Sequence, residues 1–150
     1  IYLITILGIF SCLLCIKDEK DGYYLEEINS FSGLLTKNPF LSFSLAVLLI
    51  SLAGIPPMAG FFSKLYILIS IVESKFYLLA VIAVITSVIS AFYYLKIIKV
   101  IFFDTSQNKI FCEITFSFKF FILSSVLLTI FFLFFASEVL SLINKYSIII

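Results

Sequence analysis

The sequence predicts an all-α membrane protein that crosses a lipid bilayer about four times, with the second span broken in its middle. Of its 150 residues, 63% are apolar and 13% are charged, whereas globular domains carry roughly a quarter charged residues. Four uncharged runs are each near or above the roughly 17 to 25 residues that cross a hydrocarbon core, and they cover 1–16, 38–63, 76–95 and 120–137. Ionisable residues gather between them, as in aqueous connectors. This pattern excludes a soluble enzyme domain, and we expect one transmembrane helical unit over 1–150.

The first predicted span covers about 1–16. It has no basic leader and no small-residue cleavage site, so we interpret it as a span and not as a signal peptide. The chain starts at Ile1 and not at Met. This start fits either a piece of a longer protein or an unusual start codon.

The cysteines give no sign of metal or redox chemistry. Cys12 and Cys15 are three residues apart, but the chain has no second ligand pair and no histidine to complete a tetrahedral metal site. We expect both to be small packing residues. Cys112 lies in a connector without a second loop thiol, and we expect it to be unreactive.

The connector at 17–37 starts with a run of charged residues. Apolar residues then recur at helical spacing, which predicts a short interfacial helix; these residues are Leu25, Ile28, Phe31 and Leu35. Asn38 and Pro39 follow, an N-cap residue and a proline suited to the first helical position. We therefore expect the second span to begin at Pro39.

The second predicted span, about 39–72, is too long for one straight crossing. As a single helix, 35 residues would measure about 50 Å, against a hydrocarbon core of about 30 Å. Two prolines remove backbone donors at its centre, within the run Gly54-Ile55-Pro56-Pro57. We predict two half-helices, 39–53 and 58–72, with an unwound stretch that faces a polar interior, since lipid cannot satisfy free backbone groups.

The third and fourth predicted spans cover about 76–103 and 118–137. The connector between them and its flanks are rich in lysine, whereas the opposite turn has Lys75 alone. Under the positive-inside tendency, that connector faces the cytoplasm or matrix. The connector at 17–37 then lies on the same side, and both ends of the chain lie on the other.

Lys64 is the leading candidate for a functional residue, because it lies just after the break in an otherwise uncharged stretch. A lysine at the centre of a span costs roughly 2.5 to 3.5 kcal/mol, so we expect it to face a hydrated or carboxylate-lined cavity. There it can take up and release a proton. The alternative is a static partner of a carboxylate on another chain. Gly60, one turn earlier, either allows close backbone approach beside the lysine or packs helices together.

A polar stripe recurs along the third predicted span, at Ser87, Ser90 and Tyr94. This stripe can hold water, although ordinary hydrogen bonding between helices is the interpretation we favour. Lys99 is best explained as a positive-inside anchor, while Lys96 is left open between an anchor and a functional residue. Glu73 and Glu138 lie at span ends, where interfacial charges are expected.

One segment resembles a known family. Residues 51–66 read Ser-Leu-Ala-Gly-Ile-Pro-Pro-Met-Ala-Gly-Phe-Phe-Ser-Lys-Leu-Tyr and resemble the signature of the NADH dehydrogenase subunit 2 family. This is the membrane subunit of respiratory complex I that is related to cation/proton antiporters. The similarity extends to Asn-Pro-Phe at 38–40 and to Ser-Val-Ile-Ser-Ala-Phe-Tyr-Tyr-Leu-Lys at 87–96, and it is clear over about 25–104.

The resemblance implies roles for particular residues. In the family the matching helix is discontinuous and the lysine after the break belongs to the proton path, so Lys64 inherits that role. Lys96 matches a basic residue after a run of tyrosines and is expected on the hydrophilic axis. Four residues are expected to support the site through the break: Gly54, Pro56, Pro57 and Gly60. Ser63 replaces a glycine common in the family, with little expected consequence.

The resemblance also implies an assembly. The family subunit has more helices, and these spans look like its last four, so we expect a fragment or the product of a split gene. Expected partners are the other complex I membrane subunits, a chain or segment with the missing upstream helices, and membrane lipids, but no nucleic acid.

The implied activity is that of a proton-translocating NADH:ubiquinone reductase, and it belongs to the whole complex. This chain is expected to hold no redox site, cofactor or metal, since flavin, Fe-S clusters and quinone would bind elsewhere. All ten basic residues are lysines, which suggests an organelle genome and a multi-pass protein of the mitochondrial inner membrane. The alternative is a subunit of a cation/proton antiporter of the same superfamily.

Overall fold

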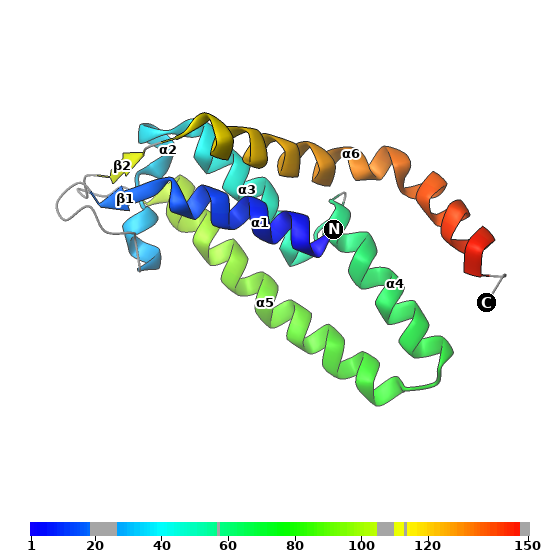
Figure 1. Cartoon of the computed structure of the whole chain (residues 1–150). Coiled ribbons are helices and arrows are strands. Elements are labelled where there is room, and N and C mark those ends of the chain that lie inside the picture. The colour runs from blue at the N-terminus through cyan, green and yellow to red at the C-terminus, as the bar shows by residue number, and fades with distance from the viewer. Residues whose placement is uncertain (19–26, 57, 105–109, 113, 148–150) are drawn as a thin grey trace.

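The computed structural model describes residues 1–18, 27–56, 58–104, 110–112 and 114–147, with side-chain surroundings given as far as residue 132. Helices dominate the described residues, as predicted (Figure 1). The elements in chain order are α1 (Tyr2–Leu14), β1 (Ile16–Asp18), η1 (Ile28–Phe31), α2 (Leu34–Lys37), α3 (Pro39–Ala53), α4 (Ala59–Glu73), α5 (Tyr77–Phe103), β2 (Ile110–Cys112) and α6 (Phe116–Ser147).

The predicted break in the second span is confirmed. Helix α3 covers Pro39–Ala53 and α4 covers Ala59–Glu73, so the two half-helices agree with the prediction to within one residue. The predicted start is confirmed as well, since the Asn38 side chain accepts a hydrogen bond from the Leu41 N–H at 3.3 Å and proline follows as the first helical residue.

Gly54 ends α3 in the left-handed conformation that glycine adopts without steric cost, with φ +80°. The Gly54 N–H donates to the Ser51 carbonyl at 3.0 Å, and the Ile55 N–H donates to the Ile50 carbonyl at 3.3 Å. These two bonds form a Schellman motif, which closes the helix end. The chain therefore stops being helical at Gly54, before it reaches the prolines.

Helices α4 and α5 form a long hairpin that projects from the rest of the chain (Figure 1). At its tip Lys75 takes the left-handed conformation, with φ 62°. Helix α5 has 27 residues, a length of about 40 Å. Within the described part of the chain it is the one helix that is long and apolar enough to cross a membrane by itself. Three shorter apolar helices accompany it, at 2–14, 39–53 and 116–132.

Large apolar side chains cover the outer surface of α5. Only 6% of its most apolar 18-residue stretch is buried inside the described part of the chain. Leu78 is 76% exposed, Val88 64% and Phe92 65%. Water would penalise such a surface, so lipid or other apolar protein surfaces are its natural environment.

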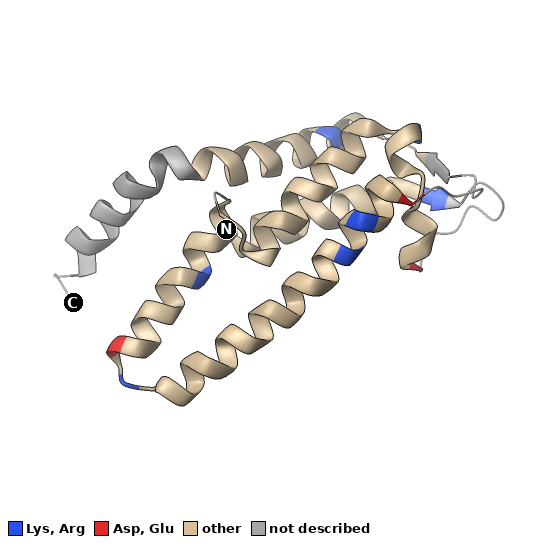
Figure 2. Cartoon of the chain, turned by 180° about the vertical axis from the view of Figure 1, so that it is seen from behind, with Lys and Arg blue, Asp and Glu red and all other residues tan. Residues whose placement is uncertain are grey.

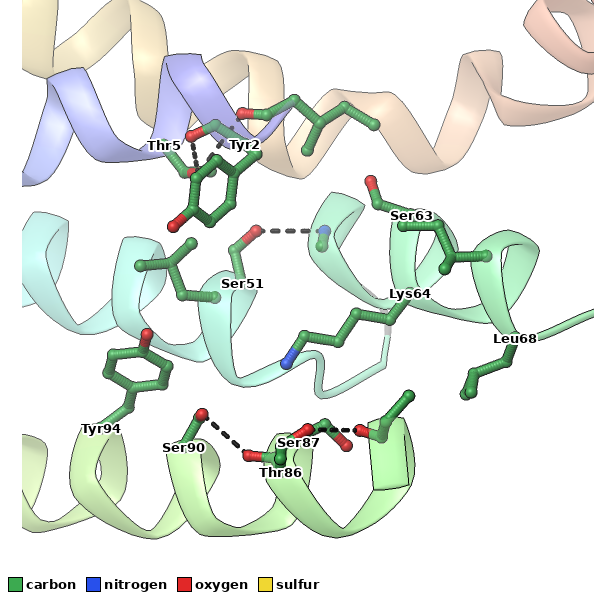
Figure 3. Close-up of a pocket in the computed structure, with 15 residues that line it drawn as sticks. Tyr2, Thr5, Ser51, Ser63, Lys64, Leu68, Thr86, Ser87, Ser90 and Tyr94 are labelled. Carbon is green, nitrogen blue, oxygen red and sulfur yellow. Dashed lines mark hydrogen bonds between the residues drawn. The ribbon is translucent and has the colours of Figure 1, made fainter. Parts of the chain in front are cut away.

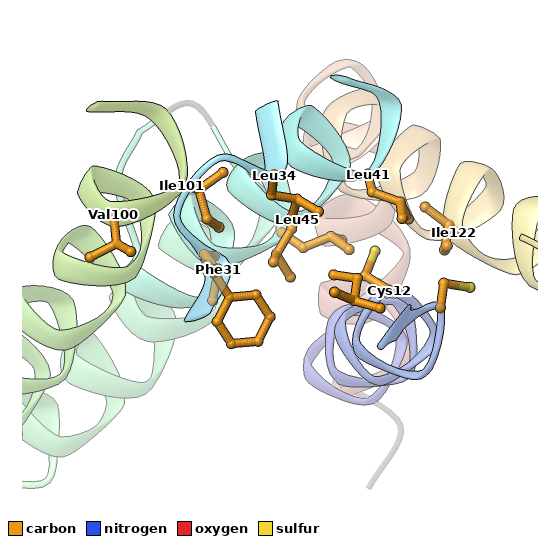
Figure 4. Close-up of a cluster of buried hydrophobic side chains, with 12 residues drawn as sticks. Cys12, Phe31, Leu34, Leu41, Leu45, Val100, Ile101 and Ile122 are labelled. Carbon is orange, nitrogen blue, oxygen red and sulfur yellow. The ribbon is translucent and has the colours of Figure 1, made fainter. Parts of the chain in front are cut away.

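The hydrophobic core lies where α1, α2, α3, α5 and α6 converge (Figure 4). Cys12 and Cys15 are fully buried in it, which confirms that they are packing residues. Gly8 lets α1 approach its neighbours closely, because a Cβ there would lie 2.7 Å from Ser125 Cβ and 2.9 Å from Leu48 Cδ1. Small residues serve this purpose in membrane helix packing.

The predicted interfacial helix in the first connector is wrong in form. The described part is divided into η1 and α2, because Gly33 interrupts it with φ 79°. Phe31 and Leu34 are buried in the core, so this segment packs against α3 and α5 and does not lie free on a membrane surface. Leu25 lies outside the described residues.

A short ribbon between β1 and β2 was not predicted. The strands pair antiparallel, with Ile16 opposite Cys112, Lys17 opposite Phe111 and Asp18 opposite Ile110. The ribbon joins the connector after α1 to the connector before α6, so both lie at the same end of the molecule. This agrees with the predicted topology.

Helix α6 extends further than the predicted fourth span. It continues to Ser147, ten residues beyond the predicted end at Ser137, because no glycine or proline follows to stop it. Glu138 therefore lies within the helix, although its side chain is outside the described surroundings.

The described charged residues lie mostly at the two ends of the molecule (Figure 2). One group is at the α4–α5 turn, with Glu73 and Lys75, and the other is near the ribbon and the adjoining ends of α5 and α6. Long uncharged stretches of helix separate them. This distribution fits a chain whose two ends are wet and whose middle lies in lipid.

Candidate functional site

A cavity of about 450 Å³ lies beside the helix break, between α1, α3, α4 and α5 (Figure 3). Most of its lining surface is apolar, and its polar groups are Lys64 and hydroxyl groups from α1, α5 and both halves of the broken helix. Its lining includes Tyr2, Thr5, Ser51, Gly60, Ser63, Lys64, Thr86, Ser87, Ser90 and Tyr94. The cavity adjoins the break on both sides, at Ser51 and Gly60, but the described residues of the unwound stretch are not in its lining. The predicted polar interior around that stretch therefore stays a prediction.

Lys64 projects from the second turn of α4 toward the end of α3 (Figure 3). Its ammonium donates a hydrogen bond to the Ala53 carbonyl at 3.0 Å. Ala53 is the last residue of α3, where unpaired carbonyls give the helix a partial negative charge. The half-helix thus offers an electrostatic partner for the cation without a carboxylate.

The position of Lys64 depends on the absence of a side chain at Gly54. A Cβ at Gly54 would lie 2.9 Å from Lys64 Cδ and 3.4 Å from both Cε and Nζ. The lysine stem therefore lies directly over the glycine that ends α3.

Gly60 holds the two half-helices together. Its N–H, in the first turn of α4, donates to the Ser51 hydroxyl of α3 at 3.2 Å. A Cβ at Gly60 would overlap the Ser51 carbonyl. Of the two predicted roles for Gly60, close packing of helices is the one this contact supports, and the contact also fixes the turn that precedes Lys64.

The polar stripe on α5 forms the opposite wall of the cavity. The Ser87 hydroxyl donates to the Val84 carbonyl at 2.7 Å, and the Ser90 hydroxyl donates to the Thr86 carbonyl at 2.9 Å. Both bonds lie within α5, so the hydroxyl protons of these two residues are not used between helices. For their acceptor oxygens the favoured interpretation, hydrogen bonding between helices, stays a prediction. A hydroxyl oxygen that donates to its own helix keeps its acceptor lone pairs for water.

The structure brings together some of the predicted site residues and separates others. Gly60 and Lys64 line the cavity, and Gly54 contacts the lysine. Lys96 is exposed on α5 and is not among the lining residues, and Pro56 is exposed at the break. Pro57 lies outside the described residues.

Sequence reasoning missed several lining residues. Ser51 was within the family-like segment, but its contact with Gly60 spans nine residues and no helical spacing indicates it. Tyr2 and Thr5 come from α1, and only the packing of α1 beside α3 brings them to the cavity. Only Thr86 could have been found from the sequence, because it directly precedes Ser87 and lies four residues, about one helical turn, before Ser90.

The charge of the cavity is unusual. Lys64 contributes the only charged side chain among the described residues that line it, and no described carboxylate does so. The cavity is large enough for several water molecules, and the hydroxyl groups in its mostly apolar lining are the groups that could bind them. Water and hydroxyl groups beside an amine can pass protons along hydrogen bonds. Over the described residues there is no group of three or more metal-ligating side chains.

Cys112 is less isolated than the sequence suggested. It lies on β2 opposite Ile16, and Ile16 directly follows Cys15 in the sequence. Burial, with a smaller contribution from Cys15, raises the pKa of the Cys112 thiol, while Lys37 acts in the opposite direction. A raised pKa reduces the thiolate fraction at neutral pH, which is consistent with a weakly reactive thiol.

Comparison with known proteins gives a family match. A family model described as NADH:quinone oxidoreductase/Mrp antiporter, TM, matches residues 1–90. The NADH-quinone oxidoreductase subunit N of Pelagibacter ubique is 44% identical over 149 residues, which is 99% of this chain and 31% of that protein. The corresponding protein of a Wolbachia species from Brugia malayi is 42% identical over 126 residues, 84% of this chain and 25% of that protein. This chain thus spans about a third or less of the length of these curated relatives.

A solved structure shares the fold. A chain of respiratory complex I from Thermus thermophilus with bound aureothin matches 93% of this chain with a TM-score of 0.75 and 24% sequence identity. The match covers 32% of that chain. The likeness shows that this chain shares the fold of about a third of that chain.

Proposed function

This chain belongs to the NADH:quinone oxidoreductase/Mrp antiporter family of membrane subunits, and from that premise we propose that it is part of a proton-translocating subunit of respiratory complex I. In this proposal it is the C-terminal portion of the subunit called subunit 2 or subunit N. The cavity at Lys64 is one part of its proton route. The observation that supports this most is a single ammonium group at a helix break, facing a cavity lined by hydroxyl groups.

The proposed role of Lys64 follows from its surroundings. The ammonium is held by a helix end and not by a described carboxylate, so a proton can leave it without breaking a strong ion pair. The hydroxyl groups on α5 supply positions for water next to it. Lys96, exposed on the same helix, is proposed to extend the hydrophilic axis toward neighbouring subunits.

The remaining parts of the reaction belong to the assembly in this proposal. NADH oxidation, flavin, Fe-S clusters and quinone reduction lie on other chains, while this chain moves protons. Its partners are the other membrane-arm subunits, including a chain or segment with the helices that complete the longer relatives. The exposed apolar surface of α5 supports such contacts.

We further propose a location in the mitochondrial inner membrane. The basic residues are ten lysines without arginine, a composition that suggests an AT-rich organelle genome. The relatives named above come from bacteria, so a bacterial inner membrane is the alternative. Either membrane fits a protein with several spans.

A second candidate is a subunit of a cation/proton antiporter, because the matching family description names the Mrp antiporters as well. The two functions predict different partners. An antiporter would exchange cations for protons without NADH, whereas a complex I subunit would pump only during NADH oxidation.

The test is to solubilise the native membranes in mild detergent and separate the intact complexes. We expect peptides of this chain in the band that oxidises NADH with a quinone acceptor, together with peptides of the missing upstream helices. Migration of this chain in a separate band with cation antiporter subunits would contradict the complex I proposal.

A further inference from the structure

The end of α3 holds Lys64 by two separate features, a backbone acceptor and an open surface. The acceptor is the Ala53 carbonyl, which lies 3.0 Å from the Lys64 ammonium. In a continuous helix, the N–H of residue 57 would bond this carbonyl, but position 57 is a proline and has no N–H. The break therefore supplies the acceptor.

The open surface is Gly54. The lysine stem crosses it so closely that a Cβ would lie 2.9 Å from Lys64 Cδ. That distance is far shorter than ordinary carbon–carbon contacts of about 3.5 to 4.0 Å. Any side chain at Gly54 would thus push the stem away from α3 and lengthen the hydrogen bond to Ala53.

The cavity offers Lys64 a second position. The hydroxyl-lined wall of α5, at Thr86, Ser87 and Ser90, lies across the cavity from the end of α3 (Figure 3). The lysine side chain is a flexible chain of four carbons that ends in an ammonium with three hydrogen-bond donors. It can leave the Ala53 carbonyl and extend into the cavity without any change in the backbone.

We propose that Gly54 is a positioning residue for proton transfer, which gives Lys64 a docked state on the Ala53 carbonyl and a released state in the cavity. This inference rests on the proposed function of the cavity. Gly54 does not touch the transferred proton. It sets the balance between the two states of the lysine.

The first test is a Gly54→Asn variant of the assembled complex, compared with Gly33→Asn. Asparagine tolerates the left-handed conformation, and the two glycines have nearly equal φ angles of 80° and 79°. Both variants thus carry the same backbone cost, but only Gly54→Asn adds a Cβ against Lys64. We expect Gly54→Asn to change the rate of NADH-driven proton uptake by about tenfold, the effect of losing one charge-assisted hydrogen bond. We also expect it to shift the pH profile of that uptake.

The same substitution in a Lys64→Gln background separates positioning from structure. If Gly54 acts through the lysine, Gly54→Asn has no further effect on the pH profile once Lys64 is removed. An equal effect with and without Lys64, or an unchanged profile in the single variant, overturns the positioning role. The proposed function is tested by a different variant from the positioning role. Normal pumping by Lys64→Gln would show that the proposed function of the cavity is wrong, whatever Gly54→Asn does.

A second pair of variants leaves Gly54 intact in case its substitution blocks assembly. Leu68 lines the cavity one turn beyond Lys64, so Lys64→Gln combined with Leu68→Lys keeps the charge but moves it away from Ala53. We expect this double variant to pump no better than Lys64→Gln alone. Recovery of pumping would show that any ammonium in the cavity suffices, and would contradict a required docked state of Lys64 on the Ala53 carbonyl.

Discussion

At the residue scale, the surroundings of Lys64 depend on contacts between residues that lie nine to eleven positions apart, too far for one helical turn. The charge of Lys64 was evident from the sequence, because an isolated cation in an apolar run is costly. Its partner was not, since a backbone carbonyl carries no sequence signal. Gly54 was predicted only as part of the break, whereas Gly60 was also predicted to allow close backbone approach beside the lysine or to pack helices together.

Gly60→Ala tests how closely the half-helices must approach. The added methyl group would overlap the Ser51 carbonyl, which belongs to the backbone and cannot rotate away. Overpacking of this kind typically costs about 1 to 3 kcal/mol. We expect less assembled complex and a lower melting temperature in detergent.

Ser63→Ala is the matched control for that substitution. Ser63 also lines the cavity, but its hydroxyl donates to the Ala59 carbonyl of its own helix at 3.3 Å. We expect nearly unchanged stability. If Gly60→Ala is as stable as Ser63→Ala, the close contact between α3 and α4 is not required.

At the element scale, local rules predicted the helices well. The Asn38 cap and the two prolines limit α3 and α4 through bonds between near neighbours, so the half-helices were predicted to within one residue. The glycine at position 33 also acts locally, yet the apolar spacing in the first connector concealed the interruption it causes.

Long-range elements could not be predicted in the same way. Strands β1 and β2 have three residues each and are separated by more than 90 positions, so their pairing follows from the packing of α1 beside α6 and not from any periodic pattern. The end of α6 was placed too early because the apolar run ends at Ser137, whereas helical structure itself continues through polar residues.

The ribbon gives a direct test of topology. In a background without the native cysteines, we expect Lys17→Cys combined with Phe111→Cys to form a disulfide on mild oxidation. The two positions are directly opposite each other, and paired residues in antiparallel strands have Cα atoms about 4.5 to 5.5 Å apart, within disulfide range. Peptide mass spectrometry measures the linked product.

The control pair is Lys75→Cys with Phe111→Cys, because Lys75 lies at the α4–α5 turn, at the opposite end of the molecule. This pair should remain unlinked under the same conditions. A link in the control pair, or none between positions 17 and 111, would contradict the arrangement of the two connectors.

At the scale of the whole molecule, charge and apolar surface have complementary distributions. The described charges lie mostly at the two ends (Figure 2). The apolar side chains of α5 are largely exposed, and Lys64 lies on α4 within an uncharged stretch that separates the two ends. An apolar surface of this kind favours contact with lipid or with other apolar protein surfaces, and the chain spans about a third of the length of the Pelagibacter relative.

The proposed role of Lys64 in proton transfer is decided by proton uptake per NADH oxidised, in vesicles that contain the complex with Lys64→Gln. The control is Lys99→Gln, since Lys99 is exposed near the end of α5 and away from the cavity. With Lys64→Gln we expect an assembled complex that still oxidises NADH but takes up fewer protons per NADH, and with Lys99→Gln we expect an unchanged ratio. An unchanged ratio in a fully assembled Lys64→Gln complex would contradict the proposed role and leave Lys64 as a static structural charge.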